Sequence, residues 1–186
     1  DDLSCGQGDI RVVYNVGGTW SYNESLTVDV DPPARETCAV QGTMTILQDG
    51  DIYIGTAKET VTCTWYPGDG SPPTTVVISA TGQIRNGLIT GDRFSHEGFF
   101  TAPGQNDEVC RTTGTLTGTD GIAATTSGTV ECEDEMDFYS TGPSHGTRTG
   151  GMNVSPGINL RGNRTIQRQN PAPNRSPLSR RSLVRQ

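Results

Sequence analysis

The fold class is decided by residues 110–132, which read CRTTGTLTGTDGIAATTSGTVEC. Two runs of alternating apolar and polar residues flank the pair Asp120-Gly121. Such alternation is typical of half-buried strands, and Asp-Gly between alternating runs signals a hairpin because the pair tolerates the positive φ of tight turns. The stretch therefore predicts an antiparallel hairpin whose inward residues are Leu116, Ile122, Ala124 and Val130.

Two further hairpins of the same kind precede this one. The first spans residues 38–63 around Asp49-Gly50, and the second spans residues 76–94 around Asn86-Gly87. The inward residues that we assign to the first hairpin are Cys38, Val40, Met44, Ile46, Ile52 and Ile54. Glycines recur within the strands on both sides of each turn, which is typical of a sheet that bends.

An earlier strand opens at Gly18-Thr19-Trp20, and Asp31-Pro32-Pro33 ends it. An eighth strand near residues 136–141 would remove the open sheet edges that attract other chains. We therefore predict an all-β fold, an antiparallel up-and-down barrel of about eight strands. The barrel domain spans residues 17–142. Residues 1–16 form an N-terminal segment that could add a strand or cover an edge, and residues 143–186 form an extended irregular arm.

Five cysteines are present, and four of them lie at the outer ends of two hairpins. We favour the disulfides Cys38–Cys63 and Cys110–Cys132, although spacing alone leaves other connectivities open. Cys5 is then either free or an intermolecular partner. Disulfides require an oxidising compartment, so we expect a periplasmic or extracellular protein. The chain begins at Asp1 without a signal peptide, which we interpret as a processed, exported product.

The strands resemble a group of uncharacterised bacterial exported domains with lipocalin-like or avidin-like meander barrels. The matching motifs are Gly18-Thr19-Trp20, the Cys38…Cys63 hairpin, Ala80-Thr81-Gly82…Leu88-Ile89-Thr90-Gly91 and the Cys110…Cys132 hairpin, within about residues 17–133. In those domains the last strand usually carries a second Gly-Thr-Trp-like element, whereas this chain has Phe138-Tyr139-Ser140. The resemblance implies the barrel fold and leaves its closure and the function open.

Charge divides the chain into two unlike parts. All 21 acidic residues lie at or before Asp137, and the part up to Asp137 carries a net charge of −15 with its six basic residues. The remainder has no Lys, Asp or Glu and carries eight arginines: Arg148, Arg161, Arg164, Arg168, Arg175, Arg180, Arg181 and Arg185. Guanidinium groups pair with carboxylates or phosphates, so these arginines are our candidate partner-binding residues.

Three partners were weighed for the arm. A protein surface is favoured, because extended segments can wrap large surfaces. Anionic lipid headgroups are a second possibility. Nucleic acid is disfavoured by the exported setting and the acidic barrel. No apolar run is long enough to span a membrane, so we expect no transmembrane segment.

A dense acidic stretch follows the last predicted hairpin. Its carboxylates are Glu131, Glu133, Asp134, Glu135 and Asp137. Three interpretations stay open: a calcium site, a solvated acidic turn, or a docking surface for arginines. Only two histidines and no C-x-x-C pair are present, which argues against zinc, and no motif suggests a cofactor.

No constellation of residues amounts to an active site, so we expect a protein that is not an enzyme. Residues 142–146 match G-x-S-x-G, but that motif requires a strand-to-helix turn, and we predict no helix after it. The favoured function is an extracytoplasmic accessory subunit, docked through the arm on a larger, membrane-bound assembly such as an electron-transfer or photosynthetic complex. The alternative is a lipocalin-like carrier of a small apolar ligand.

Overall fold

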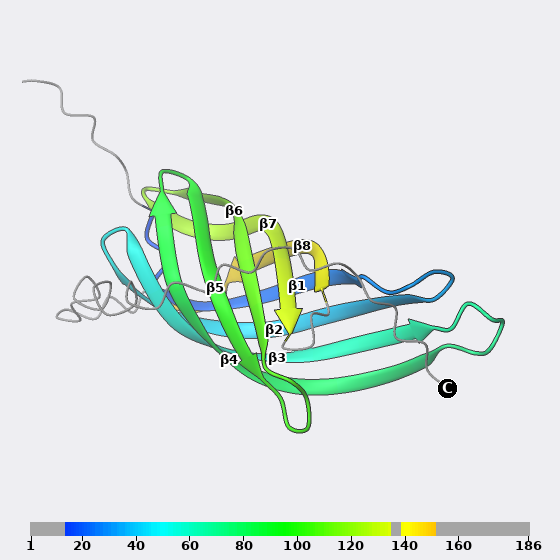
Figure 1. Cartoon of the computed structure of the whole chain (residues 1–186). Helices are drawn as coiled ribbons and strands as arrows, with labels where there is room; N and C mark the ends of the chain where they lie inside the picture. Colours follow the sequence, from blue (N-terminus) through cyan, green and yellow to red (C-terminus); the bar gives the residue numbers. More distant parts are fainter. Residues whose placement is uncertain (1–13, 135–138, 152–186) are drawn as a thin grey trace, which may run out of the picture.

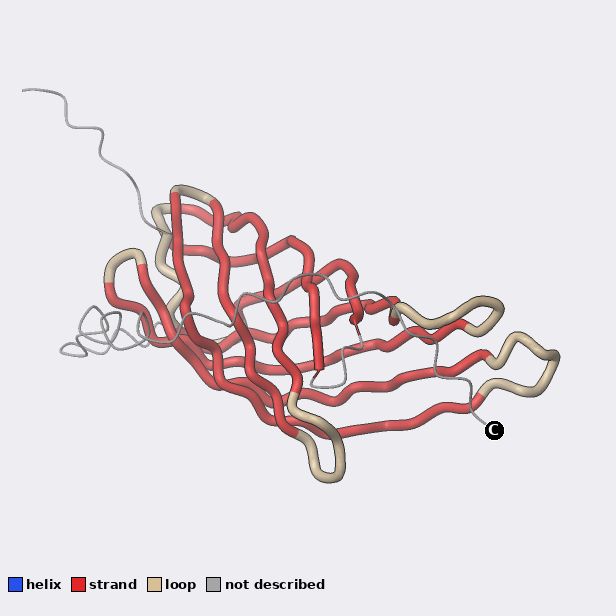
Figure 2. Tube along the Cα trace, viewed as in Figure 1, coloured by secondary structure: helices blue, strands red, loops and turns tan. Residues whose placement is uncertain are grey.

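A computed structural model describes residues 14–134 and 139–151 of the chain. Within these ranges the protein is all-β, and Figure 2 shows strands and loops without a helix. The strands are β1 (Gly18–Val28), β2 (Arg35–Asp49), β3 (Ile52–Tyr66), β4 (Thr74–Thr90), β5 (Arg93–Thr101), β6 (Glu108–Thr119), β7 (Ile122–Asp134) and β8 (Tyr139–Arg148). Each strand pairs antiparallel with the next, and β8 pairs with β1, so the predicted up-and-down barrel is confirmed and closed.

Alternation along the strands places apolar side chains inside the barrel. On β1, Trp20, Tyr22 and Leu26 are buried, whereas Asn23 and Ser25 are exposed to solvent. Glycines leave the space that the aromatic rings fill. A Cβ atom added to Gly42 would lie 2.4 Å from Cζ of Tyr22. The glycines of the strands therefore serve the packing of the barrel interior as well as its curvature.

Strand β8 ends later than the sequence predicts. It runs to Arg148, so the domain boundary expected at residue 142 cuts through a strand, and that boundary is wrong. Gly142 and Pro143 suggested the end of regular structure. Instead, the ladder with β1 is interrupted between the pairs Glu24–Ser144 and Thr27–Thr141, where Pro143 has no N–H to donate. Pro143 is still paired with Thr129 of β7.

One predicted turn is confirmed, and a second lies one residue away from its predicted position. Asp120-Gly121 forms a turn in which both residues have positive φ, 54° and 71°. The turn after β2 lies one residue later than expected, at Gly50-Asp51, because Asp49 still pairs with Ile52.

Asn86-Gly87 is not a turn, contrary to the prediction. The pair lies within β4, where the register with β5 shifts between Arg85 and Leu88, and the chain reverses only after Thr90, which pairs with Arg93. Asn86 has a φ of 54°. A bulge can require a positive φ, as a hairpin turn does, and asparagine tolerates it in both. The Asn-Gly pair alone therefore does not distinguish a bulge from a turn.

Three of the inward assignments in the first and third hairpins are wrong for a related reason. Ile54 is 36% exposed, because β3 presents Tyr53, Glu59 and Cys63 to the interior, and Ile54 has the opposite parity. On β7, Ile122 and Ala124 face outward, and Ala123 is fully buried. Gly118 pairs with Ala123 and Thr117 with Thr125, which leaves Ala124 as an extra residue that reverses the face.

One end of the barrel is closed by the residues that precede β1. Asn15 forms a parallel bridge with Ile122, and Val16 is buried in the core. The Nε2 group of Gln48 donates to the carbonyl of Tyr14 at 2.9 Å. This part of the N-terminal segment therefore covers the barrel end at a sheet turn, while residues 1–13 lie outside the described residues.

Arg148 secures this closed end, so the prediction that places it in the arm is wrong. Its Nε donates to the carbonyl of Ala123 at 2.7 Å, and its terminal nitrogens donate to the carbonyls of Gly17 and Asn15. Its guanidinium carbon lies 5.1 Å from the ring centroid of Trp20. As the last residue of β8, Arg148 joins both ends of the barrel domain.

Replacement of Arg148 by Met should destabilise the barrel by about 2–4 kcal/mol, because three carbonyls lose a charged donor. Arg111→Met is the matched control. Arg111 is exposed and makes an ion pair with Glu97 at 3.4 Å, and such a surface pair contributes about 0–1 kcal/mol. Urea unfolding followed by tryptophan fluorescence measures both. Equal stability of the two variants would contradict this role of Arg148.

A chain that ends at Gly142 should fail to form the closed barrel, because it lacks most of β8 and exposes the edges of β1 and β7. A chain that ends at Gly151 retains every described strand and should keep the β-sheet circular dichroism spectrum and cooperative melting. Cooperative melting of the shorter chain would show that the pairing of β8 with β1 is dispensable.

Candidate functional site

Two cavities lie inside the barrel, one behind the other. The larger, about 530 Å³, is lined by residues from the end of the barrel opposite Arg148, among them Val28, Glu36 and Asp134. We call it the mouth cavity. The smaller, about 50 Å³, reaches toward Val16 and Trp20, and we call it the inner chamber. Glu24, Phe100 and Cys110 line both and so form the boundary between them.

The strands that surround the mouth cavity extend to different heights at the open end of the barrel. In Figure 1 the loops that follow β1 and β3 project past the loop that follows β5, so β2, β3 and β4 form one long wall. Val76, near the start of β4, lines the cavity and is 55% exposed. The cavity therefore opens to solvent at this end of the barrel.

Both predicted disulfides are confirmed, and both line the mouth cavity. Cys38–Cys63 joins β2 to β3, and Cys110–Cys132 joins β6 to β7. Each links two residues that are direct cross-strand partners. The covalent links hold two walls of the mouth in fixed register. The remaining cysteine, Cys5, lies outside the described residues.

Carboxylates face the cavity from five different strands. They are Glu24 on β1, Glu36 on β2, Glu59 on β3, Glu108 on β6 and Asp134 on β7. The sequence analysis missed them as a set, although a signal exists. Glu36 and Glu108 each stand two residues before an inward cysteine, and Asp134 stands two residues after one, so period two places them on the inner face.

Glu59 is the most deeply placed of these carboxylates, with 9% of its surface exposed. The hydroxyl of Tyr22 donates to its Oε2 at 2.6 Å. Tyr22 can reach it because Gly42, which pairs with both residues, carries no side chain between them. Burial raises the pKa of Glu59, and the hydrogen bond from Tyr22 lowers it. Its second oxygen has no hydrogen-bond partner among the described residues.

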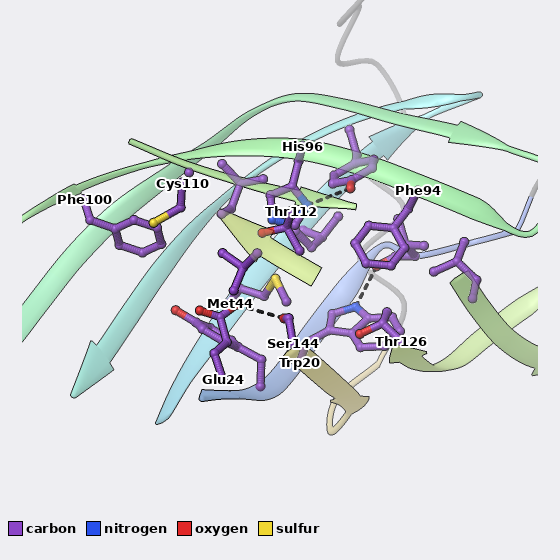
Figure 3. Close-up of a pocket in the computed structure, with 18 residues that line it drawn as sticks. Trp20, Glu24, Met44, Phe94, His96, Phe100, Cys110, Thr112, Thr126 and Ser144 are labelled. Atoms are coloured by element: carbon purple, nitrogen blue, oxygen red, sulfur yellow. Dashed lines mark hydrogen bonds between the residues drawn. The ribbon is translucent and has the colours of Figure 1, made fainter. Parts of the chain in front are cut away.

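Glu24 is held by Ser144, the central residue of the G-x-S-x-G match. The Ser144 hydroxyl donates to Oε1 of Glu24 at 2.8 Å, and Figure 3 shows the two side chains facing each other. The motif lies within β8, and His145 points to the outer face. The structure therefore lacks the strand-to-helix turn that a nucleophile elbow needs, as the sequence analysis expects.

Burial raises the pKa of Glu24 to about 7 and that of Glu108 to about 7. The negative charge of Glu59 contributes to both increases, that of Glu108 to the increase at Glu24, and that of Asp134 to the increase at Glu108. The hydrogen bond from Ser144 opposes the rise at Glu24. Glu24, Glu59 and Glu108 thus interact electrostatically across the barrel, and Glu24 and Glu108 are partly protonated at neutral pH.

The inner chamber is largely apolar and nearly filled. Figure 3 shows Trp20, Phe94 and Phe100 around it, with His96 among them. Burial lowers the pKa of His96 to about 4, so its ring is neutral at pH 7. The ring nitrogen Nδ1 lies 2.9 Å from the hydroxyl of Tyr53. With about 50 Å³ of space, this chamber can hold little beyond water.

The dense acidic stretch does not form a single cluster in its described part. Glu131 and Glu133 are exposed on the outer face of β7, whereas Asp134 faces the mouth cavity. Strand alternation separates them, so these three do not converge on one ion. Glu135 and Asp137 lie outside the described residues, and the calcium and docking interpretations stay predictions.

Two groups of potential metal ligands occur among the described residues, and each includes a disulfide. Glu36 lies within 4.8 Å of the sulfurs of Cys38 and Cys63, and Glu108 has the same relation to Cys110 and Cys132. Metals bind cysteine as the thiolate, so the oxidised sulfurs are poor ligands. Of the eight candidate arginines, Arg148 contacts the protein's own carbonyls, and the other seven lie outside the described residues.

Comparisons with family models, curated proteins and solved structures find no match for this chain. The resemblance to exported meander barrels therefore stays a prediction. Nothing helical in the described part of the chain has the length and hydropathy needed to cross a bilayer. The site must be interpreted from its own chemistry.

Stability should fall as the pH rises from 5 to 8. The folded-state pKa values of Glu24 and Glu108, about 7, exceed the ordinary carboxyl value of 4.5. The folded protein binds these protons more tightly than the unfolded chain, so their stabilisation is full below pH 4.5 and is lost as the pH passes 7. We expect a loss on the order of 1–3 kcal/mol in urea unfolding.

The double variant Glu24→Gln, Glu108→Gln should flatten this dependence, because it cannot ionise at either position. Glu133→Gln, on the outer face of β7, is the control and should keep it. Wild-type stability that stays constant or increases between pH 5 and pH 8 would show that these carboxylates are not destabilised by burial.

Proposed function

We propose that this protein is a non-enzymatic carrier that holds one small molecule in the mouth cavity. The observation that supports this most is a solvent-open cavity of about 530 Å³ inside a disulfide-linked barrel. Ligand pockets commonly measure about 300–1,000 Å³ and combine apolar walls with a few polar groups. An eight-stranded barrel encloses room for one small ligand when its side chains leave it unfilled.

The walls supply both kinds of group. Leu26, Val40, Ile78 and Phe100 give an apolar surface, and the carboxylates described above give polar positions. The disulfides and the closed ladder keep these walls in place without a ligand, which lowers the entropy lost on binding. A rigid, preformed cavity favours a carrier over a structural role for the barrel.

The arrangement of Ser144 supports the non-enzymatic part of the proposal. The serine of a G-x-S-x-G nucleophile elbow is presented on a sharp strand-to-helix turn, whereas Ser144 lies within the extended strand β8. His145 lies on the opposite face of the strand. The two disulfides fit a protein that acts in an oxidising compartment, so we also propose an exported location.

Docking as an accessory subunit stays a prediction about the arm. Seven of its eight arginines lie outside the described residues, and Arg148 belongs to the barrel. The arm and the cavity are compatible, because a carrier can also bind a protein partner. The described geometry favours the carrier hypothesis.

Filling the mouth cavity should abolish ligand binding. Ala80 lines the cavity on β4 and is 8% exposed, so Ala80→Phe would occupy part of its volume. Thr101→Trp at the rim narrows the opening without altering the core. The measurement uses naphthalene-based fluorescent probes that are neutral, cationic or anionic. Wild type should bind at least one of these probes. Both variants should bind that probe at least tenfold more weakly, a loss of about 1.4 kcal/mol in binding free energy.

Ala39→Phe is the matched control, since Ala39 lies on the outer face of β2. It should bind as wild type does. Thermal melting verifies that each variant is folded. Failure of every probe to bind wild type, or equal binding by the cavity variants and the control, would refute the carrier hypothesis.

A further inference from the structure

We propose that the ligand of the mouth cavity is an organic cation, an apolar molecule that carries a protonated amine or a quaternary ammonium group. This inference rests on the proposed carrier function, because it names the chemical class of the molecule that the cavity holds. It departs from the expectation of a purely apolar ligand.

The charge of the cavity wall has one sign. Among the described residues, five carboxylates line it, and no Lys, Arg or His does. Strands β4 and β5 add no ionisable group to the wall; they supply residues such as Ile78, Ala80 and Phe100. From β8 the only ionisable residue is the phenol of Tyr139. With several carboxylates ionised, the cavity has a strongly negative potential, which low-dielectric walls intensify.

The positively charged side chains that the structure describes lie outside the mouth cavity. Arg111 pairs with Glu97 on the outer surface, and Arg148 caps the closed end. Arg35 stacks 4.4 Å from the ring centroid of Tyr66. Lys58, Arg85 and Arg93 are exposed and do not line the cavity. Within the described residues, no positive side chain compensates the carboxylates of the mouth.

Of the three carboxylates whose pKa values are raised, two each accept one hydrogen bond from a described side chain and the third accepts none. Tyr22 donates to one oxygen of Glu59, and Ser144 donates to one oxygen of Glu24. The backbone of Glu108 pairs with β5 and β7, but its carboxylate has no hydrogen bond to another described residue. All three are partly desolvated, which disfavours their ionised forms, and they also repel one another. A bound cation would offset both penalties, so the unliganded site is best complemented by positive charge.

The surface between the carboxylates distinguishes an organic cation from a metal ion. Hard cations need several oxygen ligands that converge at about 2.3–2.6 Å. The cavity instead separates its acids with apolar side chains, including Leu26, Val61 and Ile78. The ring of Phe100 can also attract an ammonium group through its face. A molecule with an apolar body and a cationic head matches both kinds of surface.

Binding of a cation must displace protons. The pKa values of Glu24 and Glu108 are about 7, so both carboxyls are partly protonated at neutral pH. A cation stabilises their ionised forms and lowers these pKa values. Affinity for a cation should therefore increase between pH 6 and pH 8, while affinity for a neutral molecule should not. A permanently charged quaternary ammonium isolates this effect from ionisation of the ligand.

The test compares an aryl trimethylammonium probe with its neutral tert-butyl isostere, in which carbon replaces nitrogen. Isothermal titration calorimetry with the full chain should show at least tenfold tighter binding of the cation at pH 8. The difference should shrink at pH 6. Titrations in buffers of different ionisation enthalpy should show release of protons when the cation binds, and none when the neutral isostere binds.

Glu24→Gln, Glu59→Gln and Glu108→Gln, singly and together, should remove this preference while retaining the neutral isostere. The outer-face variant Glu133→Gln is the control and should bind as wild type does. If the triple variant does not fold, the pH dependence and proton release of wild type still decide the question.

The outcomes separate the two proposals. Equal or tighter binding of the neutral isostere, blocked by Ala80→Phe, would overturn the cationic ligand and leave the carrier function standing. Cation binding that Ala80→Phe and the glutamine variants leave unchanged would place the probe outside the mouth cavity and overturn the inference. Failure of both probes and of an anionic sulfonate isostere to bind would overturn both proposals.

Discussion

The pairing of β1 with β8 is the constraint on which the rest of the structure depends. A meander of eight strands has two free edges until its first and last strands meet, and only closure gives it an interior. Arg148 lies at the end of this seam, bound to carbonyls of the segment that precedes β1 and of β7. The pairing of β1 with β8 closes the sheet, and Arg148 at the end of β8 also closes one end of the barrel. The opposite end stays open, and the asymmetry of the cavity follows from it.

The interior is filled unevenly from one end to the other. Near the closed end, Trp20, Phe94 and Leu116 pack around the inner chamber. At the open end, aliphatic residues alternate around the wall with carboxylates, and about 530 Å³ stays unfilled. A protein that needed only stability would gain by replacing such carboxylates with apolar side chains. Stability alone therefore does not account for the five acids on the inner face, and this is the reason that we propose a binding role for the open end.

The sequence analysis was most reliable where a signal is local. The Asp120-Gly121 turn and the cross-strand cysteines follow from short-range geometry, and both are confirmed. The predictions were wrong where the same short sequence is compatible with two different local structures. Asn86-Gly87 supports a bulge as well as a turn, and Gly142-Pro143 interrupts one ladder without ending the strand. Each bulge then reversed the faces that strict alternation assigns, as at Ile122 and Ala123.

The sequence by itself determined the all-β class and the meander order and favoured the two disulfides, because these depend on neighbours along the chain or across one hairpin. Only the tertiary structure decided that Glu24, Glu59 and Glu108 share one cavity and that Arg148 closes the barrel. Those three carboxylates come from strands that are not all adjacent in the barrel order, and their proximity depends on closure of the whole sheet. Their ionisation likewise depends on burial and mutual repulsion, which no single strand contains.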